Sequence, residues 1–344
     1  MIKNLKINKN RNNINGIFAI DKFKFFYKVL TIEEYDRELN GYNQLKEYYP
    51  VSRLIYNHKI SSKNGILIFE YENSVDSQSG LLVNLFFNNH SFNDDKLLFS
   101  KILNIYKNVF IKTISKTKET SSDVFFSNRI KTRINNFYSK DFLDRCLNKK
   151  FKLNNFEIVL NTEVIIISVK KYFKIKINKW SVISQCDPND LNIGTKPVLF
   201  DYLAGGKNPV MAEFAVFFWY NLAQGSYLSP KYNRSLKEYT KNSDKLDNVS
   251  LINNSIRHKI SKKRKEFILS YIDKVISPVI KNIGIYDDWY NDFKNYFAMK
   301  VLAVFDVSKM SKKDMLLSLG YLELFYNNLD IKNLKDLKEV VNKL

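Results

Sequence analysis

The sequence predicts an α+β fold of two lobes: a five-stranded antiparallel sheet with one helix, then a mainly helical lobe that carries a β-hairpin insertion. Residues 1–72 contain five short runs of β-branched and aromatic residues and one capped helical stretch. Beyond residue 94, apolar residues recur mostly at helical spacing. Because 344 residues are enough for two cores, we expect one lobe over 1–72 and a second over 73–344.

The first three strands are expected at residues 5–8, 16–20 and 24–30, separated by Asn, Arg and Asp clusters that favour turns. Lys28 lies in the middle of the third run, between aromatic and apolar residues. A lysine there is costly unless its ammonium finds a partner, so Lys28 is either paired or on an edge that faces solvent.

A helix is expected directly after the third strand. Thr31 and Glu34 form the pattern of a capping box, apolar residues follow at helical spacing, and Pro50 marks the end. Strands at 52–58 and 65–72 complete the sheet.

The second lobe is expected to consist mostly of helices, interrupted once. Residues 151–177 alternate apolar and polar side chains, which predicts a β-hairpin or small sheet that either covers the substrate or is buried structure. The helices are expected at about 94–115, 122–148, 210–224, 256–282, 286–305, 311–327 and 332–343.

One stretch carries recognisable chemistry. Asp187 and Asn192 lie five apart in QCDPNDLN, and the apolar run PVLF then leads to Asp201. Phosphoryl transfer needs a carboxylate that takes the proton of the attacking hydroxyl, together with an amide oxygen and a second carboxylate that hold Mg²⁺.

Residues 181–232 resemble the aminoglycoside phosphotransferase/choline kinase family, small-molecule kinases with a protein-kinase-like fold. The resemblance implies that Asp187 is the catalytic base and that Asn192 and Asp201 are metal ligands, and it matches Glu213 to a later acidic position. The usual His and Gly before the Asp are replaced by Gln185 and Cys186.

The same resemblance assigns the nucleotide site. It implies that Lys28 binds phosphates and that Glu38 supports it, with Glu34 as the alternative. It places the base of ATP or GTP against the backbone at Glu70, Tyr71 and Glu72. The phosphate-covering hairpin would be residues 9–15, which contain no glycine.

The composition limits the partners. The net charge of +20 reflects either an AT-biased coding sequence, rich in Lys, Asn and Ile, or an anionic partner. Nucleic acid is not expected because the lysines are scattered and no binding motif is present, and a polycationic aminoglycoside is disfavoured by repulsion. No apolar run is long enough to span a membrane, residues 1–15 show no secretory signal, and two cysteines cannot build a disulfide framework. We therefore expect a cytoplasmic protein.

These observations predict a Mg²⁺-dependent kinase that moves the γ-phosphoryl of ATP or GTP to a hydroxyl of a small molecule. The acceptor remains open among an antibiotic, an amino alcohol, a sugar and another metabolite. The alternatives are a catalytically inactive binding or scaffolding subunit, motivated by Gln185 and Cys186, and a peptide-modifying kinase. A monomer or a homodimer is expected.

Overall fold

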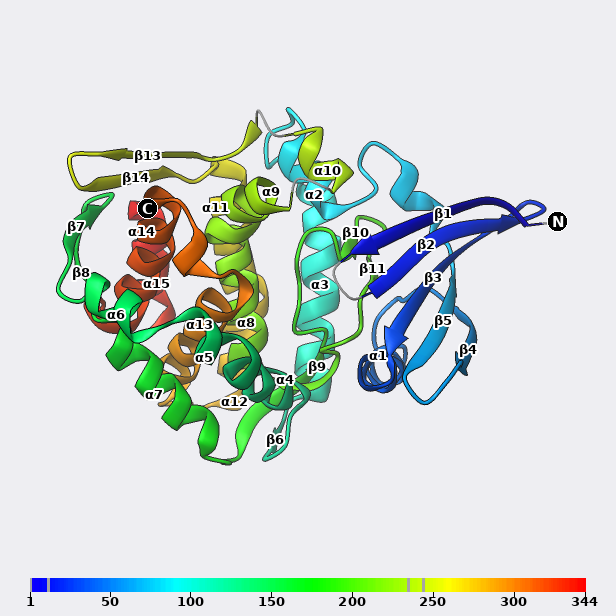
Figure 1. The fold of residues 1–344 in the computed structure, drawn as a ribbon, viewed down its shortest axis with the longest axis horizontal. Helices are drawn as coiled ribbons and strands as arrows, with labels where there is room; N and C mark the ends of the chain where they lie inside the picture. The colour runs from blue at the N-terminus through cyan, green and yellow to red at the C-terminus, as the bar shows by residue number, and fades with distance from the viewer. Residues whose placement is uncertain (1, 11–12, 234–235, 243–244) are drawn as a thin grey trace.

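The computed structural model describes residues 2–10, 13–233, 236–242 and 245–344, with side chains from residue 14 onward. An N-terminal antiparallel sheet lies at one end of the molecule and a helical body at the other (Figure 1). Within the described residues, no helix is long and apolar enough to cross a membrane.

The N-terminal sheet has five strands in the order β1-β2-β3-β5-β4, as predicted. One helix, α1, follows β3. Tyr35, Leu45, Leu67 and Phe69 from the helix and sheet are buried together in the core. The bounds are β1 Ile2–Asn10, β2 Asn13–Ile20, β3 Phe23–Thr31, α1 Ile32–Leu45, β4 Leu54–Lys59 and β5 Asn64–Glu70.

The helix α1 begins as predicted, because the Thr31 side chain accepts a hydrogen bond from the Glu34 backbone N–H at 3.4 Å. Gly41 lets it approach the segment after Asp201 closely: a Cβ at this position would lie 1.9 Å from the Tyr202 carbonyl oxygen. The sheet is therefore tied through α1 to the segment that carries Asp201.

The helical body is built around α8, Val210–Trp219, in which every residue is buried. The longest helices around it are α3 Lys96–Thr113 and α13 Trp289–Val304. Shorter helices complete the body: α2 Leu82–Phe87, α4 Ser121–Arg129, α5 Asn135–Phe137, α6 Lys140–Cys146, α7 Thr162–Lys174, α9 Ser229–Tyr232, α10 Lys237–Thr240, α11 Lys262–Tyr271, α12 Ser277–Ile283, α14 Lys312–Glu323 and α15 Leu334–Lys343. Several continue as π-helical segments, η2 Ile130–Ile134, η3 Tyr220–Leu228, η5 Ile272–Ile276 and η7 Leu324–Asn328.

The helical body contains more strands than predicted. A three-stranded sheet has the order β12-β9-β6, a two-stranded sheet pairs β10 with β11, and a four-stranded sheet has the order β13-β14-β7-β8. Their bounds are β6 Ser115–Thr117, β7 Lys150–Leu153, β8 Phe156–Val159, β9 Lys179–Ser184, β10 Ile193–Gly194, β11 Val198–Leu199, β12 Gly206–Pro209, β13 Asn248–Ile252 and β14 Ser255–Lys259.

The predicted insertion at 151–177 is only partly correct. The hairpin β7–β8 is present, but the second half forms the helix α7. Ile165, Ile166 and Val169 are buried at helical spacing, whereas Val164 and Ile167 are exposed. Burial of one helical face therefore outweighed the β propensity of this isoleucine-rich stretch. The start of the predicted helix 256–282 is likewise wrong, because β14 occupies its first residues.

Candidate active site

The segment from Gln185 to Asn192 forms a loop between β9 and the β10–β11 hairpin. At the open end of this hairpin the Phe200 N–H donates to the Asn192 carbonyl at 2.9 Å. The antiparallel pairing therefore brings the chain back beside Asn192 just before Asp201. Cys186 and Asp201 have φ values of 53° and 64°, in the left-handed region that costs a side-chain-bearing residue energy. The two turns that set the site are thus held by the surrounding structure.

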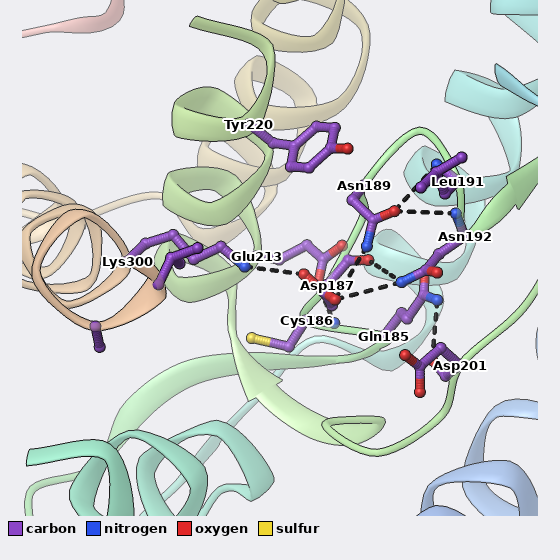
Figure 2. A network of polar contacts seen from close by, with 12 residues as sticks. Gln185, Cys186, Asp187, Asn189, Leu191, Asn192, Asp201, Glu213, Tyr220 and Lys300 are labelled. Atoms are coloured by element: carbon purple, nitrogen blue, oxygen red, sulfur yellow. Dashed lines mark hydrogen bonds and ion pairs between the residues drawn. The ribbon is translucent and has the colours of Figure 1, made fainter. Parts of the chain in front are cut away.

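The Asp187 carboxylate is surrounded by donors (Figure 2). Its Oδ2 accepts from the Asn189 amide at 3.1 Å and from the Asn192 amide at 3.3 Å. Its Oδ1 pairs with the Lys300 ammonium at 2.9 Å. Three groups therefore orient the Asp187 carboxylate. The side chain is still 33% exposed and lines a cavity.

Gln185 holds the loop against the segment that carries Asp201. Its amide nitrogen donates to the Phe200 and Asp201 carbonyls, the latter at 3.0 Å. A glutamine can thus hold the loop in place by hydrogen bonding. The family that residues 181–232 resemble has a histidine at this position.

Glu213, in the first turn of α8, contacts the same loop at Cys186. Its Oε2 accepts a hydrogen bond from the Cys186 backbone N–H at 2.5 Å. Because the side chain is fully buried, the pKa of this carboxyl rises to about 8.

Lys28 lies beside two carboxylates, as its position in the sequence predicted for a paired lysine. Its ammonium is 2.6 Å from Glu38 Oε1 and 3.2 Å from Asp201 Oδ1. Burial alone would lower the pKa of Lys28 and raise that of Asp201, but the opposite charges outweigh it and raise the Lys28 pKa and lower the Asp201 pKa. Glu34 lies instead in the first turn of α1, where it is half-buried.

A cavity of about 330 Å³ lies on the sheet side of Asp201. Phe26, Phe69 and Leu191 give it an apolar wall. Its lining includes all predicted nucleotide and metal residues except Glu38, which is buried behind Lys28: Lys28, Glu70, Tyr71, Glu72, Asn192 and Asp201. The turn of the predicted phosphate-covering hairpin, Arg11 and Asn12, lies outside the described residues.

A second cavity of about 510 Å³ lies on the helical side of Asp187. It is lined by parts of α4, η3 and α13 together with the loop from Cys186 to Leu191. Asp201 and Leu191 line both cavities, so the two spaces meet at these residues.

A buried network fixes the far side of the loop. Arg264 of α11 pairs with Asp190 at 2.7 Å and packs over the Phe86 ring at 4.0 Å from its centroid. The Tyr220 hydroxyl also donates to Asp190, at 2.8 Å. Both charged side chains are almost fully buried, so the pair anchors the loop to the helical body.

Lys300 and Arg264 were not predicted as site residues from the sequence. Lys300 interrupts an apolar stretch of α13, Ala298–Val304, and a lysine in such a stretch needs a partner for the reason that applied to Lys28. That signal could have identified Lys300 as a site residue, but it could not have named Asp187 as the partner.

The side chains of Asp201 and Asn192 carry oxygen ligands of the kind that Mg²⁺ prefers. An ionised carboxylate and an amide oxygen are hard oxygen donors, and Mg²⁺ bound between them and nucleotide phosphates needs few protein ligands. Within the described part of the chain, no group of three or more His, Cys, Asp or Glu side chains could hold a metal.

The N-terminal antiparallel sheet followed by a helical body gives the chain the architecture of a protein-kinase-like fold. Aminoglycoside phosphotransferase APH(4)-Ia, solved as a thermostable mutant with AMP-PNP and hygromycin B, matches with a TM-score of 0.52 and 7% identity. The match covers 94% of this chain and 93% of that one. The chain therefore has the aminoglycoside phosphotransferase fold, and the resemblance predicted from residues 181–232 is confirmed for the fold.

Two further solved structures are similar at lower scores. Spectinomycin phosphotransferase APH(9)-Ia, solved with ADP and spectinomycin, covers 100% of this chain and 94% of its own at 10% identity and a TM-score of 0.48. A microcompartment-associated aminopropanol kinase covers 94% and 90% at 8% identity and a TM-score of 0.42. No family model and no curated protein matches the sequence.

Proposed function

We propose that this chain is a phosphotransferase that moves the γ-phosphoryl of ATP or GTP to a hydroxyl of a small molecule. The meeting of the two cavities at Asp201 carries the proposal. One cavity contains the Lys28 ammonium, and the other contains the Asp187 carboxylate. A donor in the first and an acceptor in the second would meet at the residue that best suits a metal ion.

In the proposed reaction the acceptor hydroxyl oxygen attacks the γ-phosphorus, and its proton passes to Asp187. The new oxygen–phosphorus bond replaces the bond to the β–γ bridging oxygen, which leaves with the nucleoside diphosphate. Lys300, Asn189 and Asn192 orient the Asp187 carboxylate for this proton transfer.

The remaining site residues hold the nucleotide. Lys28, kept in place by Glu38, would bind phosphate oxygens. Asn192 and Asp201 would hold Mg²⁺, which would neutralise negative charge on the phosphates. The base would lie against the backbone at Glu70, Tyr71 and Glu72, beside the apolar side chains that line the smaller cavity. In this proposal residues 1–72 form the nucleotide lobe and 73–344 the catalytic and acceptor lobe.

A thermal-shift series tests the nucleotide site. The wild type and Asp201→Asn are measured with ATP and with GTP, each with and without Mg²⁺, and Asp330→Asn serves as an exposed control. A ligand at about 100 times its Kd stabilises the fold by roughly 2.7 kcal/mol, an easily measured shift. We expect a Mg²⁺-dependent shift in the wild type and Asp330→Asn that is lost in Asp201→Asn. No shift with either nucleotide would favour the binding or scaffolding alternative.

A further inference from the structure

The larger cavity, beside Asp187, is lined by more cationic than anionic side chains among the described residues. Its lining contains three cationic side chains, Arg129, Arg133 and Lys300. Among the described residues that line it, the only carboxylates are Asp187 and Asp201, which the proposed reaction already uses. Among these described lining residues, no further acidic group is present to receive an amine of the acceptor.

Two of these cations lie on one face of a continuous helical segment. Phe125, Arg129 and Arg133 are spaced four residues apart along α4 and η2, and all three line the cavity. The Arg129 guanidinium lies 4.6 Å from the centroid of the Phe125 ring. This face offers an acceptor positive charge next to an aromatic surface.

The third cation, Lys300, lies on α13, and the structure fixes its relation to Arg133. The Arg133 Nη1 donates to the Ala303 carbonyl at 2.7 Å, near the end of α13. Lys300 lies one helical turn earlier on α13, where it pairs with Asp187. One helical turn advances about 5.4 Å. The Arg133 guanidinium is therefore close enough to the Asp187 carboxylate for one small molecule to contact both groups.

We infer that the acceptor is an anionic hydroxyl compound, whose phosphate or carboxylate group faces Arg129 and Arg133 while its hydroxyl faces Asp187. This inference rests on the proposed function and names its substrate class. A polycationic acceptor would enter a cavity lined with like charge in a chain of net charge +20, where long-range repulsion slows its capture. Arginine binds phosphate and carboxylate well because its planar N–H donors match their oxygens.

The first test compares compounds that share a carbon skeleton and differ in one charged or neutral substituent. One set is glycerol 3-phosphate, glycerate, glycerol and 2-amino-1,3-propanediol, and a second is glucose 6-phosphate, glucuronate, glucose and glucosamine. Binding of each compound is measured by calorimetry in the presence of AMP-PNP and Mg²⁺. We expect the phosphate or the carboxylate member of at least one set to bind at least about tenfold more tightly than its neutral and amine counterparts, a difference of about 1.4 kcal/mol.

Several results would overturn the inference. Tighter or equal binding of the neutral or amine members in both sets would do so, and so would no binding of any anionic member at about 10 mM when AMP-PNP binds. The absence of AMP-PNP binding would instead count against the proposed function, so the two failures are distinguishable. Within a set, the phosphate and carboxylate members distinguish the two kinds of anion.

The second test changes the cavity. Arg129→Gln and Arg133→Gln should each weaken the best anionic ligand about tenfold and leave the neutral member of its set unchanged. Arg145→Gln, an exposed arginine on α6 outside the cavity, is the matched control and should keep wild-type affinity. Unchanged anion affinity in both Arg129→Gln and Arg133→Gln would overturn the inference.

The Arg133→Gln variant also loses the hydrogen bond to α13, so its stability needs a control of its own. Arg133→Lys keeps the positive charge and should retain most of the preference for anions, whereas a purely structural role would make both variants equally weak. The Mg²⁺-dependent thermal shift with AMP-PNP, measured on every variant, reports whether the nucleotide site is intact.

Discussion

The Lys300 ammonium lies 2.9 Å from Asp187 Oδ1, and this ion pair joins α13 to the loop that carries the predicted catalytic base. It connects residues 113 positions apart in the sequence. The contact both orients Asp187 and brings positive charge to the place where a transferred phosphoryl group would pass.

Replacing Lys300 should therefore impair catalysis more than nucleotide binding. Lys300→Met is expected to lower kcat by about 100-fold, the size of effect seen when one electrostatic group is removed from a site. The nucleotide-induced thermal shift should persist, because Lys300 does not line the smaller cavity. Lys309→Met, an exposed lysine after α13, is the control, and wild-type kcat in Lys300→Met would contradict the assigned role.

Asp187 itself is the most direct test of the reaction. Asp187→Asn keeps the shape of the side chain but cannot take the hydroxyl proton, so transfer should fall by at least about 100-fold. Nucleotide affinity should change little, which isothermal titration with AMP-PNP and Mg²⁺ would measure. Normal turnover in this variant would exclude Asp187 as the base.

The buried carboxyl of Glu213 predicts a pH dependence of stability. Its pKa is about 8 in the folded protein, against a reference value of 4.5, because burial disfavours the charged form. Between these values the folded state holds a proton that the unfolded state has released, so the free energy of unfolding should fall as pH rises from about 5 to 8 and then level off. A shift of this size corresponds to a change on the order of 3–5 kcal/mol.

The control for this pH effect is Glu213→Gln. Its amide resembles the protonated carboxyl and can still accept the hydrogen bond from the Cys186 N–H. Urea unfolding at several pH values should show a flatter profile in this variant than in the wild type. Identical slopes in both proteins would exclude Glu213 as the titrating group.

The ion pair between Arg264 and Asp190 should be important for stability as well as for the loop. Arg264→Met leaves Asp190 buried without its counter-charge, which typically costs about 3–5 kcal/mol. Adding Asp190→Asn should recover part of this loss, because the remaining group is no longer charged. Lys262→Met, at a site 90% exposed on the same helix, should stay within about 0.5 kcal/mol of the wild type.

Local patterns predicted the N-terminal part well. The capping box placed the start of α1, and the short runs of β-branched and aromatic residues placed the five strands. The lysine in an apolar strand indicated a pair, which the structure forms between Lys28 and Glu38. In these cases neighbours in the sequence, or strands joined by short turns, decide the structure.

Predictions from local patterns were wrong where tertiary packing outweighs the secondary-structure propensity of a segment. The isoleucine-rich residues 162–174 are a helix because one face is buried in the helical body, and residues 255–259 are a strand because they pair with β13 and β7. Neither outcome is set by the residues of the segment alone.

The sequence by itself determined the chemistry of the loop: a carboxylate, an amide and a second carboxylate at spacings that short turns bring together. Only the tertiary structure decided which charges surround that loop. Lys300 and Arg264 reach the loop from helices far along the chain. Arg129 and Arg133, on α4 and η2, line the larger cavity beside the loop. Helix packing sets these approaches through side-chain shape and burial across the whole core, so no local spacing encodes them.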